Sequence, residues 1–149
     1  MTSKIEVYNP MSAYNSAINK LEKNGIRATK QRRVLAKLIF DKGKRHISAE
    51  NLFDEVKNDE RRISMATIYN TLKQFTNLGL IREIVVDQNK SLYCNNNQSH
   101  YHLYIEDEGK VIDIPTQNID LDIPSIPACL KLHDIDVIVR VRTLKDKNS

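Results

Sequence analysis

The stretch Ile-Ser-Met-Ala-Thr-Ile-Tyr-Asn-Thr-Leu-Lys-Gln-Phe, residues 63–75, decides the fold of this chain. Ser64 stands directly before a run of helical spacing, where its hydroxyl can accept a hydrogen bond from a first-turn N–H group. The sequence therefore predicts an amphipathic helix that begins after Ser64 and buries one face. The apolar residues that mark this face are Met65, Ile68, Leu72 and Phe75.

The opposite face of this helix mixes hydroxyl, amide, aromatic and cationic side chains and carries no acid. Such a face suits a helix in the major groove of DNA, because hydroxyl and amide groups read base edges and lysine contacts phosphate. An ordinary solvent-exposed helix face is the alternative interpretation. The residues concerned are Thr67, Tyr69, Asn70, Lys73 and Gln74.

Three further helices are predicted before this stretch. The first runs through Tyr14 and ends at Gly25, after a mobile arm over residues 1–12. The second lies between Thr29 and Gly43, and the third begins after Ser48, each with its own apolar stripe.

Two strands, Leu80–Val86 and Lys90–Cys94, follow the fourth helix around a turn at residues 87–89. Helices followed by a β-hairpin are typical of the winged-helix variant of helix-turn-helix proteins. We therefore expect residues 1–94 to form a winged-helix DNA-binding domain with an N-terminal arm.

The sequence pattern of residues 95–149 differs from that of residues 1–94 and predicts a second domain. A hairpin is expected from Tyr101–Ile105 and Lys110–Ile114, and residues 134–143 alternate as a third strand. Three strands bury little apolar surface alone, so we expect the sheet to pair with a second copy of the chain. The predicted fold class is α+β: a winged-helix domain followed by a small α/β dimerisation domain with an antiparallel sheet.

Composition and charge limit the function classes. The chain has 149 residues, 40% hydrophobic, without an apolar run of the ~20 residues that span a membrane or a signal-peptide core, so a cytoplasmic location is expected. Residues 1–88 carry 16 Lys and Arg against 10 Asp and Glu, whereas residues 89–149 carry 7 against 9. A polyanion partner is therefore expected for the first part only.

A basic cluster at the start of the second helix supports this partner. Cations in a first turn oppose the helix dipole, which favours a phosphate contact over a purely solvated cluster. We expect Tyr69 and Asn70 to contact bases, and Arg27, Arg32 and Lys73 to hold phosphates. The full set predicted to bind double-stranded DNA is Arg27, Thr29, Gln31, Arg32, Ser64, Thr67, Tyr69, Asn70 and Lys73.

Candidate metal ligands gather around the second domain. His100 and His102 are two residues apart on a predicted strand, so both imidazoles point to the same side, and Asp113 lies on the partner strand. His46 and Cys94 complete a mixed set suited to Fe(II), Mn(II) or Zn(II). Surface histidines without a role and a small buried cysteine are the alternative interpretations.

The order of four motifs resembles the ferric uptake regulator (Fur) family. They are Gly-Ile-Arg-Ala-Thr-Lys-Gln-Arg from residue 25, His-Ile-Ser-Ala-Glu-Asn-Leu from 46, Ala-Thr-Ile-Tyr-Asn-Thr-Leu from 66 and His-Tyr-His-Leu from 100. Within the family the sequence most resembles the haem-linked iron response regulators, and peroxide-responsive members come next.

The resemblance implies a regulatory metal site at His46, Cys94, His100, His102 and Asp113. Family members normally carry a carboxylate where this chain has Cys94. The structural zinc cysteines of the family would fall at Ile105 and Glu108, so no tetrathiolate zinc is expected. In the haem-linked relatives the histidine cluster is a proposed haem site, which would fall here on His100 and His102.

The expected function is that of a homodimeric transcriptional repressor of iron, haem or oxidative-stress genes, controlled by a divalent metal ion or haem. A peroxide sensor that uses metal-catalysed oxidation of a ligand histidine is the nearest alternative. A small metalloenzyme is disfavoured, because neither a nucleophile–base pair nor a cofactor fingerprint accompanies the ligands. A metal-independent winged-helix interaction module is the remaining alternative.

Overall fold

The computed structural model describes residues 10–57, 62–96 and 98–145. The first nine residues of the predicted arm lie outside these ranges. The chain separates into two compact units, Met1–Asn97 and Gln98–Ser149, called here the N-terminal and C-terminal units. Among the described residues, no helix is both long and apolar enough to cross a membrane.

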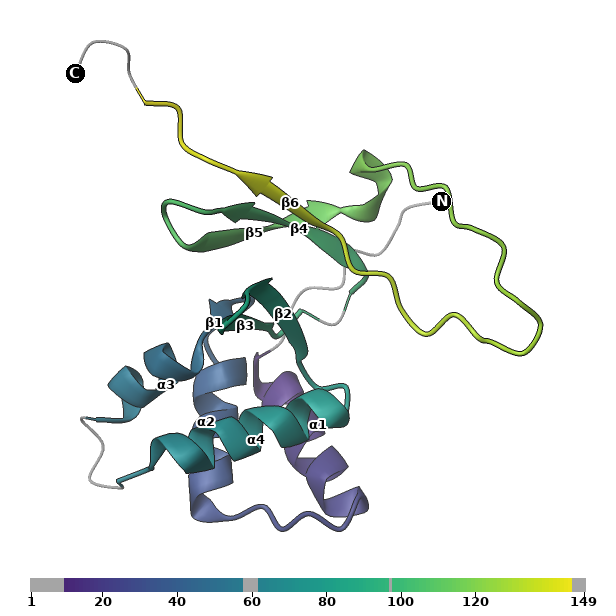
Figure 1. The fold of residues 1–149 in the computed structure, drawn as a ribbon. Helices are drawn as coiled ribbons and strands as arrows, with labels where there is room; N and C mark the ends of the chain where they lie inside the picture. The colour runs from purple at the N-terminus through teal and green to yellow at the C-terminus, as the bar shows by residue number, and fades with distance from the viewer. Residues whose placement is uncertain (1–9, 58–61, 97, 146–149) are drawn as a thin grey trace. The chain divides into compact units, whose positions relative to one another are not determined.

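Four helices of the N-terminal unit form where capping residues and apolar stripes predict them (Figure 1). The Oγ1 of Thr29 accepts a hydrogen bond from the backbone N–H of Arg32 at 3.2 Å, and Ser64 Oγ accepts from Thr67 N–H at 3.2 Å. Helix α1 starts at Pro10, inside the stretch predicted to be a mobile arm. The helices are α1 (Pro10–Lys23), α2 (Lys30–Phe40), α3 (Ala49–Val56) and α4 (Met65–Asn77).

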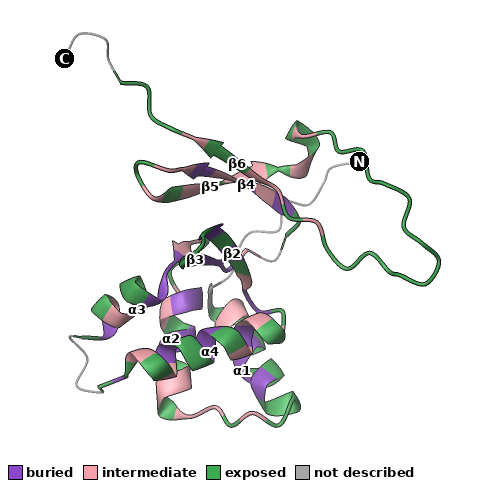
Figure 2. Ribbon diagram, in the orientation of Figure 1, coloured by how far each residue is buried: buried purple, intermediate pink, exposed green. Residues whose placement is uncertain are grey.

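The core of this unit lies between the helices, which turn their apolar stripes toward one another (Figure 2). Phe75 of α4 is fully buried, and its ring stacks on Phe40 of α2 with 6.2 Å between centroids. The predicted apolar stripe of α4 is therefore the part of the helix that anchors it, and its polar face stays outside. Fully buried members of the core include Leu21, Leu35, Ile39, Leu52, Ile68 and Leu72.

A small antiparallel sheet completes the N-terminal unit. Strands β2 (Arg82–Asp87) and β3 (Lys90–Cys94) form the predicted hairpin, and β1 (His46–Ile47) pairs with the other edge of β3. A two-residue strand is too short to leave a periodic pattern, so β1 was not predicted. Its pairing sets His46 directly opposite Cys94.

The C-terminal unit holds a second three-stranded sheet in the order β5-β4-β6. Strands β4 (His100–Ile105) and β5 (Lys110–Pro115) are antiparallel, as predicted, and the 3₁₀ turn η1 (Thr116–Asn118) follows. Strand β6 (Ile138–Val141) joins β4 in parallel, which corrects the expectation of an antiparallel sheet. The reason is that residues 116–137 leave and return at the same end of the sheet.

Strand β6 is also shorter than the predicted strand over residues 134–143. Beyond it the chain is held by side chains of the β4–β5 turn rather than by a strand. The Thr143 N–H donates to Asp107 Oδ1 at 2.9 Å, and Arg142 Nε donates to Glu106 Oε2 at 2.8 Å. The architecture as a whole confirms the predicted α+β class with a winged-helix N-terminal unit.

Candidate metal centre and nucleic-acid interface

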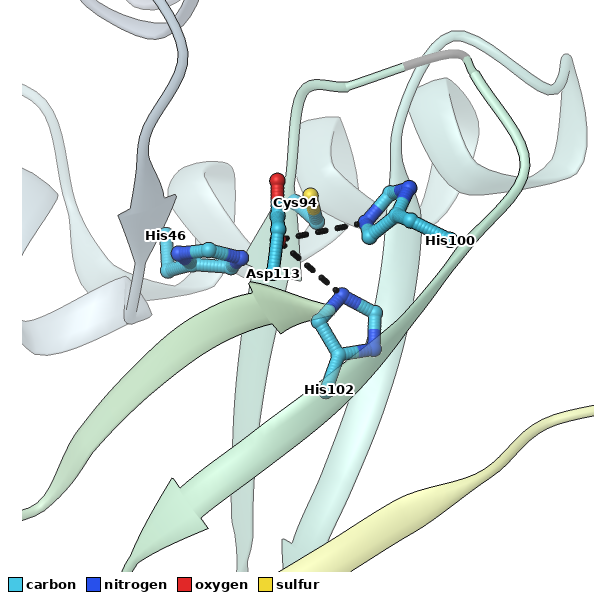
Figure 3. Close-up of side chains that lie close together, drawn as sticks. All are labelled: His46, Cys94, His100, His102 and Asp113. Atoms are coloured by element: carbon cyan, nitrogen blue, oxygen red, sulfur yellow. Dashed lines mark ion pairs between the residues drawn. The ribbon is translucent and has the colours of Figure 1, made fainter. Parts of the chain in front are cut away.

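Two histidines and one aspartate converge on the sheet of the C-terminal unit (Figure 3). His100 and His102 point to the same face of β4, and the register places Asp113 of β5 opposite His102. The Nε2 atoms of His100 and His102 lie 3.3 and 3.6 Å from the same atom, Asp113 Oδ1. Both imidazoles are buried, with 6% and 4% of their residue surface exposed.

The His100 ring is oriented by the backbone just before β4. Its Nδ1 lies 2.5 Å from the carbonyl oxygen of Gln98. Because a carbonyl oxygen can only accept, Nδ1 donates this hydrogen bond, and Nε2 is the ring nitrogen that faces Asp113. Metal-binding histidines are typically held in this way by a second hydrogen bond on the far nitrogen.

The donor set of these three residues fits a divalent ion. One ligand atom from each residue lies within 4.8 Å of the others, so all three can reach a common centre. Two imidazole nitrogens and a carboxylate oxygen suit Zn(II), Mn(II) and Fe(II). The rings of His100 and His102 meet edge to face at 4.5 Å between centroids, which leaves both nitrogens directed at the carboxylate.

The remaining predicted ligands form a pair on the N-terminal unit. His46 on β1 and Cys94 on β3 are cross-strand partners, and a nitrogen of His46 lies within 4.8 Å of Cys94 Sγ. Cys94 is buried, with 1% of its surface exposed. This pair offers an imidazole and a thiolate, a softer combination than the set on the other unit.

The predicted DNA-reading residues of α4 divide into two kinds. Tyr69, Asn70 and Lys73 are exposed along one face of the helix. Ser64 and Thr67 instead bind each other, with 3.0 Å between their hydroxyl oxygens, as part of the helix cap. Tyr69, Asn70 and Lys73 therefore form the exposed polar face of α4 that is predicted to contact DNA.

At the start of α2, Arg32 is held in place by two acceptors. Its Nε donates to Gln74 Oε1 of α4 at 3.1 Å, and its Nη1 donates to the carbonyl oxygen of Arg27 at 2.6 Å. Arg27 itself is exposed, and Gln31 is half-buried. Gln74 was placed on the polar face of α4, but its contact with Arg32 was not predicted, because 42 residues separate the two and no local pattern relates them.

Tyr69 also has a partner that the sequence did not indicate. Its hydroxyl donates to Glu50 Oε1 of α3 at 3.0 Å. The hydrogen bond to Glu50, with partial burial and the charge of that carboxylate, raises the pKa of Tyr69 above its ordinary value. Glu50 therefore orients the aromatic side chain that is predicted to contact bases.

Replacing Glu50 with alanine is expected to lower the pKa of Tyr69, because both the acceptor and the negative charge disappear. The shift can be followed by the ultraviolet absorbance of phenolate, with Tyr69→Phe identifying the signal. Tyr93 must be followed in the same titration, because burial and the charges of Glu83, Tyr69 and Glu50 together raise its pKa to about 12. An unchanged Tyr69 titration would contradict the contact.

A protein-family comparison identifies the chain. Residues 23–140 match the model of the Ferric uptake regulator family. The chain belongs to the ferric uptake regulator family. The four sequence motifs that suggested this resemblance lie within or across that range, so the predicted family is confirmed.

Individual relatives and solved structures agree with this assignment. The chain is 31% identical over 104 residues to the peroxide-responsive repressor PerR of Staphylococcus saprophyticus, covering 70% of each protein. It resembles the Helicobacter pylori ferric uptake regulator Fur, whose structure reveals three functional metal binding sites, with a TM-score of 0.68, 18% identity and coverage of 95% and 97%. A zinc-bound manganese uptake regulator matches with a TM-score of 0.59, 27% identity and coverage of 86% and 98%.

Membership in the Fur family fixes the class of activity. The chain is a metal-controlled transcription regulator and not an enzyme. Regulators of this family are DNA-binding dimers. Relatives of this chain include peroxide-responsive repressors, the subgroup whose resemblance was placed second in the sequence analysis. The closer resemblance to the haem-linked iron response regulators stays a prediction.

Proposed function

We propose that this Fur family member is a homodimeric repressor of iron-related or oxidative-stress genes whose operator affinity is set by one divalent ion. The convergence of His100 and His102 on Asp113 carries this proposal, because it brings two buried imidazoles and a half-buried carboxylate together on one face of the sheet. His46 and Cys94 complete the proposed ligand set from the N-terminal unit. The family assignment supports metal control, and the donor chemistry supports these residues as the ligands.

In the proposed function, each of the two units has its own role. Residues 1–94 would bind double-stranded DNA, and residues 95–149 would dimerise and sense the metal in the cytoplasm. A bound divalent ion supplies positive charge that ligands of both units share. Because ligands from both units must meet at the ion, binding selects one arrangement of the DNA-binding units. Operator affinity changes if DNA prefers that arrangement.

The identity of the ion depends on Cys94. A thiolate shifts preference toward Zn(II) and makes ligand binding sensitive to oxidation. The zinc-bound manganese uptake regulator at 27% identity supports divalent metals as the relevant class. Haem, the other ligand expected from the sequence, is less well supported. Both Nε2 atoms face the same carboxylate oxygen, an arrangement that suits a small ion better than a planar macrocycle.

A peroxide-responsive regulator is a second candidate, favoured by relatives such as the repressor of Staphylococcus saprophyticus at 31% identity. In this form, iron held by the same ligands would promote oxidation of a ligand histidine by peroxide. Mass spectrometry of the iron-loaded protein after peroxide treatment distinguishes the two. An added oxygen on His46, His100 or His102 supports peroxide sensing, and oxidation confined to Cys94 excludes the histidine mechanism.

The proposed function is tested by metal titration coupled to DNA binding. Duplexes are first selected from a random pool with the purified full chain in the presence of Mn(II), Fe(II) or Zn(II). Affinity for the selected duplex is then measured with each ion, with haem, and with a chelator. A gain in affinity with one ion supports metal control, and equal affinity under every condition overturns it.

The exposed face of α4 gives a prediction that separates base reading from phosphate binding. Asn70→Ala is expected to relax preference at one base pair, at a cost of about 1–3 kcal/mol there. Lys73→Ala should instead weaken all duplexes alike and lower the salt slope by about one unit. Competition binding with single-base variants of the selected duplex, at several salt concentrations, measures both. If Asn70→Ala kept the full sequence preference, α4 would not be the reading helix.

A further inference from the structure

A buried asparagine, Asn95, follows Cys94, and its side-chain amide is fully hydrogen-bonded. Asn95 is 2% exposed, and its Nδ2 donates to the carbonyl oxygens of Ile39 and Gly43, each at 2.7 Å. Its Oδ1 accepts from the backbone N–H of Arg45 at 2.8 Å, and its own N–H donates to the Arg45 carbonyl at 3.4 Å. Both amide hydrogens and the amide oxygen of this side chain therefore bind backbone groups.

Arg45, the partner of Asn95, extends the same network toward α3. Its Nη1 donates to the carbonyl oxygen of Leu38 at 3.0 Å, and its guanidinium binds both carboxylate oxygens of Glu55, at 2.5 and 3.3 Å. Partial burial opposes ionisation of Glu55, but the hydrogen bonds and charges of Arg45 and Lys42 outweigh it and lower the pKa of Glu55. A bidentate, charge-assisted contact of this kind fixes geometry as well as adding stability.

The network adjoins the proposed ligand pair of the N-terminal unit. Arg45 directly precedes His46, and Asn95 directly follows Cys94. Arg45 and Asn95 extend the pairing of His46 with Cys94 by one step: the Asn95 N–H donates to the Arg45 carbonyl oxygen, and the Arg45 N–H donates to the side-chain oxygen of Asn95. A shift of either ligand therefore moves residues that are tied to the end of α2 and to Glu55 of α3.

The helices reached by this network also hold the proposed DNA-contacting side chains. Glu50 at the first turn of α3 binds Tyr69, and Arg32 at the start of α2 binds Gln74 of α4. Helices α2 and α3 therefore contact both the network beside the ligand pair and the side chains of α4 that are predicted to bind DNA. A continuous hydrogen-bonded connection of this kind can carry coupling between two sites, and a measured effect of one site on the other is what demonstrates it.

We propose that Asn95 is a positioning residue that holds His46 opposite Cys94 and, through Arg45 and Glu55, couples metal binding at this pair to helices α2 and α3. The inference rests on the proposed function, because it takes His46 and Cys94 as ligands. In this proposal Asn95, which is not a metal ligand, sets the geometry of the His46–Cys94 pair and transmits part of the effect of the metal on DNA binding. By reciprocity, the same coupling makes metal binding tighter when DNA is bound.

The first experiment measures ligand geometry with Co(II) as the probe on the full chain. Asn95→Ala is expected to lower Co(II) affinity by about 10–100-fold, the usual effect of removing a residue that orients ligands. It should also weaken the thiolate-to-cobalt absorption that reports Cys94. Asn24→Ala is the matched control, because Asn24 Nδ2 donates to the Lys20 carbonyl at 2.8 Å at the end of α1, away from both ligands.

The second experiment separates coupling from geometry. Glu55→Gln leaves Asn95 and both ligands in place, so the Co(II) spectrum and affinity should match those of the unaltered protein. The metal-induced gain in affinity for the selected duplex should fall at least several-fold. If Asn95→Ala does not fold, Glu55→Gln decides the proposal, and an unchanged metal-induced gain overturns it.

Failure of this inference is distinguishable from failure of the proposed function. If Asn95→Ala only lowers the melting temperature and keeps the Co(II) affinity and absorption, the positioning role is wrong while metal control stands. If the unaltered protein binds Co(II) but its DNA affinity never responds, the proposed function fails. In that case the Co(II) spectrum of Asn95→Ala still decides whether Asn95 positions the pair.

Discussion

Replacing His100 and His102 together with alanine is expected to abolish the metal response of DNA binding while the protein stays folded. Both Nε2 donors of the C-terminal set disappear, and Asp113 alone remains on that sheet face. The loss of metal affinity should exceed the 10–100-fold that follows removal of a residue that only orients a ligand. Neither imidazole belongs to the hydrophobic core, so circular dichroism should show an intact fold.

The fourth histidine of the chain provides the control for this experiment. His133 is exposed in the connection before β6 and lies outside the ligand cluster, so His133→Ala should keep both metal affinity and the DNA response. In the unaltered protein, metal affinity should fall in acid solution, because imidazoles must lose their protons to bind. A double variant that retained full metal binding and response would place the regulatory site elsewhere.

Val139→Asp is expected to convert the dimer into monomers. The register aligns Ile112, Leu103 and Val139 across β5, β4 and β6, so they form one apolar row on the sheet. Ile112 is 50% exposed and Val139 is 36% exposed, which is unusual for a row of this kind unless a partner covers it. Further exposed apolar residues occur in the connection between β5 and β6: Leu121, Ile123, Ile126, Leu130 and Leu132.

A carboxylate buried in such an interface costs several kcal/mol, so the dimer dissociation constant should rise by about 100-fold or more. Sedimentation velocity at micromolar concentration measures the change. Val85→Asp is the matched control, because Val85 of β2 is a strand valine with 56% exposure in the N-terminal unit. A monomeric unaltered protein, or a dimer that survives Val139→Asp, would remove this face from the interface.

The parts of the fold that local patterns determine were predictable. Strand Lys90–Cys94 was predicted with the bounds it has, and Thr29, Ser48 and Ser64 cap the helices as expected. Capping depends on residues three positions apart, so the sequence contains all the information needed. The hairpin of Tyr101–Ile105 and Lys110–Ile114 likewise follows from its turn, which is why Asp113 was expected on the strand that pairs with the histidines. The structure adds that Asp113 pairs with His102.

Features that join distant segments were not predictable in this way. The parallel direction of β6 depends on the path of the chain after β5, and residues 116–133 have no periodic pattern that predicts this path. The hydrogen bonds from Arg32 to Gln74 and from Tyr69 to Glu50 depend on how the helices pack, and no local pattern in the sequence predicts either pairing. Asn95 was missed for the same reason, since its bonds reach back about 50 residues.

The parallel placement of β6 also has a consequence for the order in which the C-terminal unit folds. Within the β4–β5 hairpin, Ile105 pairs with Lys110, whereas on the other edge His102 pairs with Ile138. Contacts between residues distant in sequence form later, because closing the longer loop costs more chain entropy. Nascent chains should therefore pass through a stage in which one edge of β4 is exposed, and such an edge can recruit strands from neighbouring chains. We expect assembly yield to depend on how quickly residues 138–141 reach that edge during synthesis.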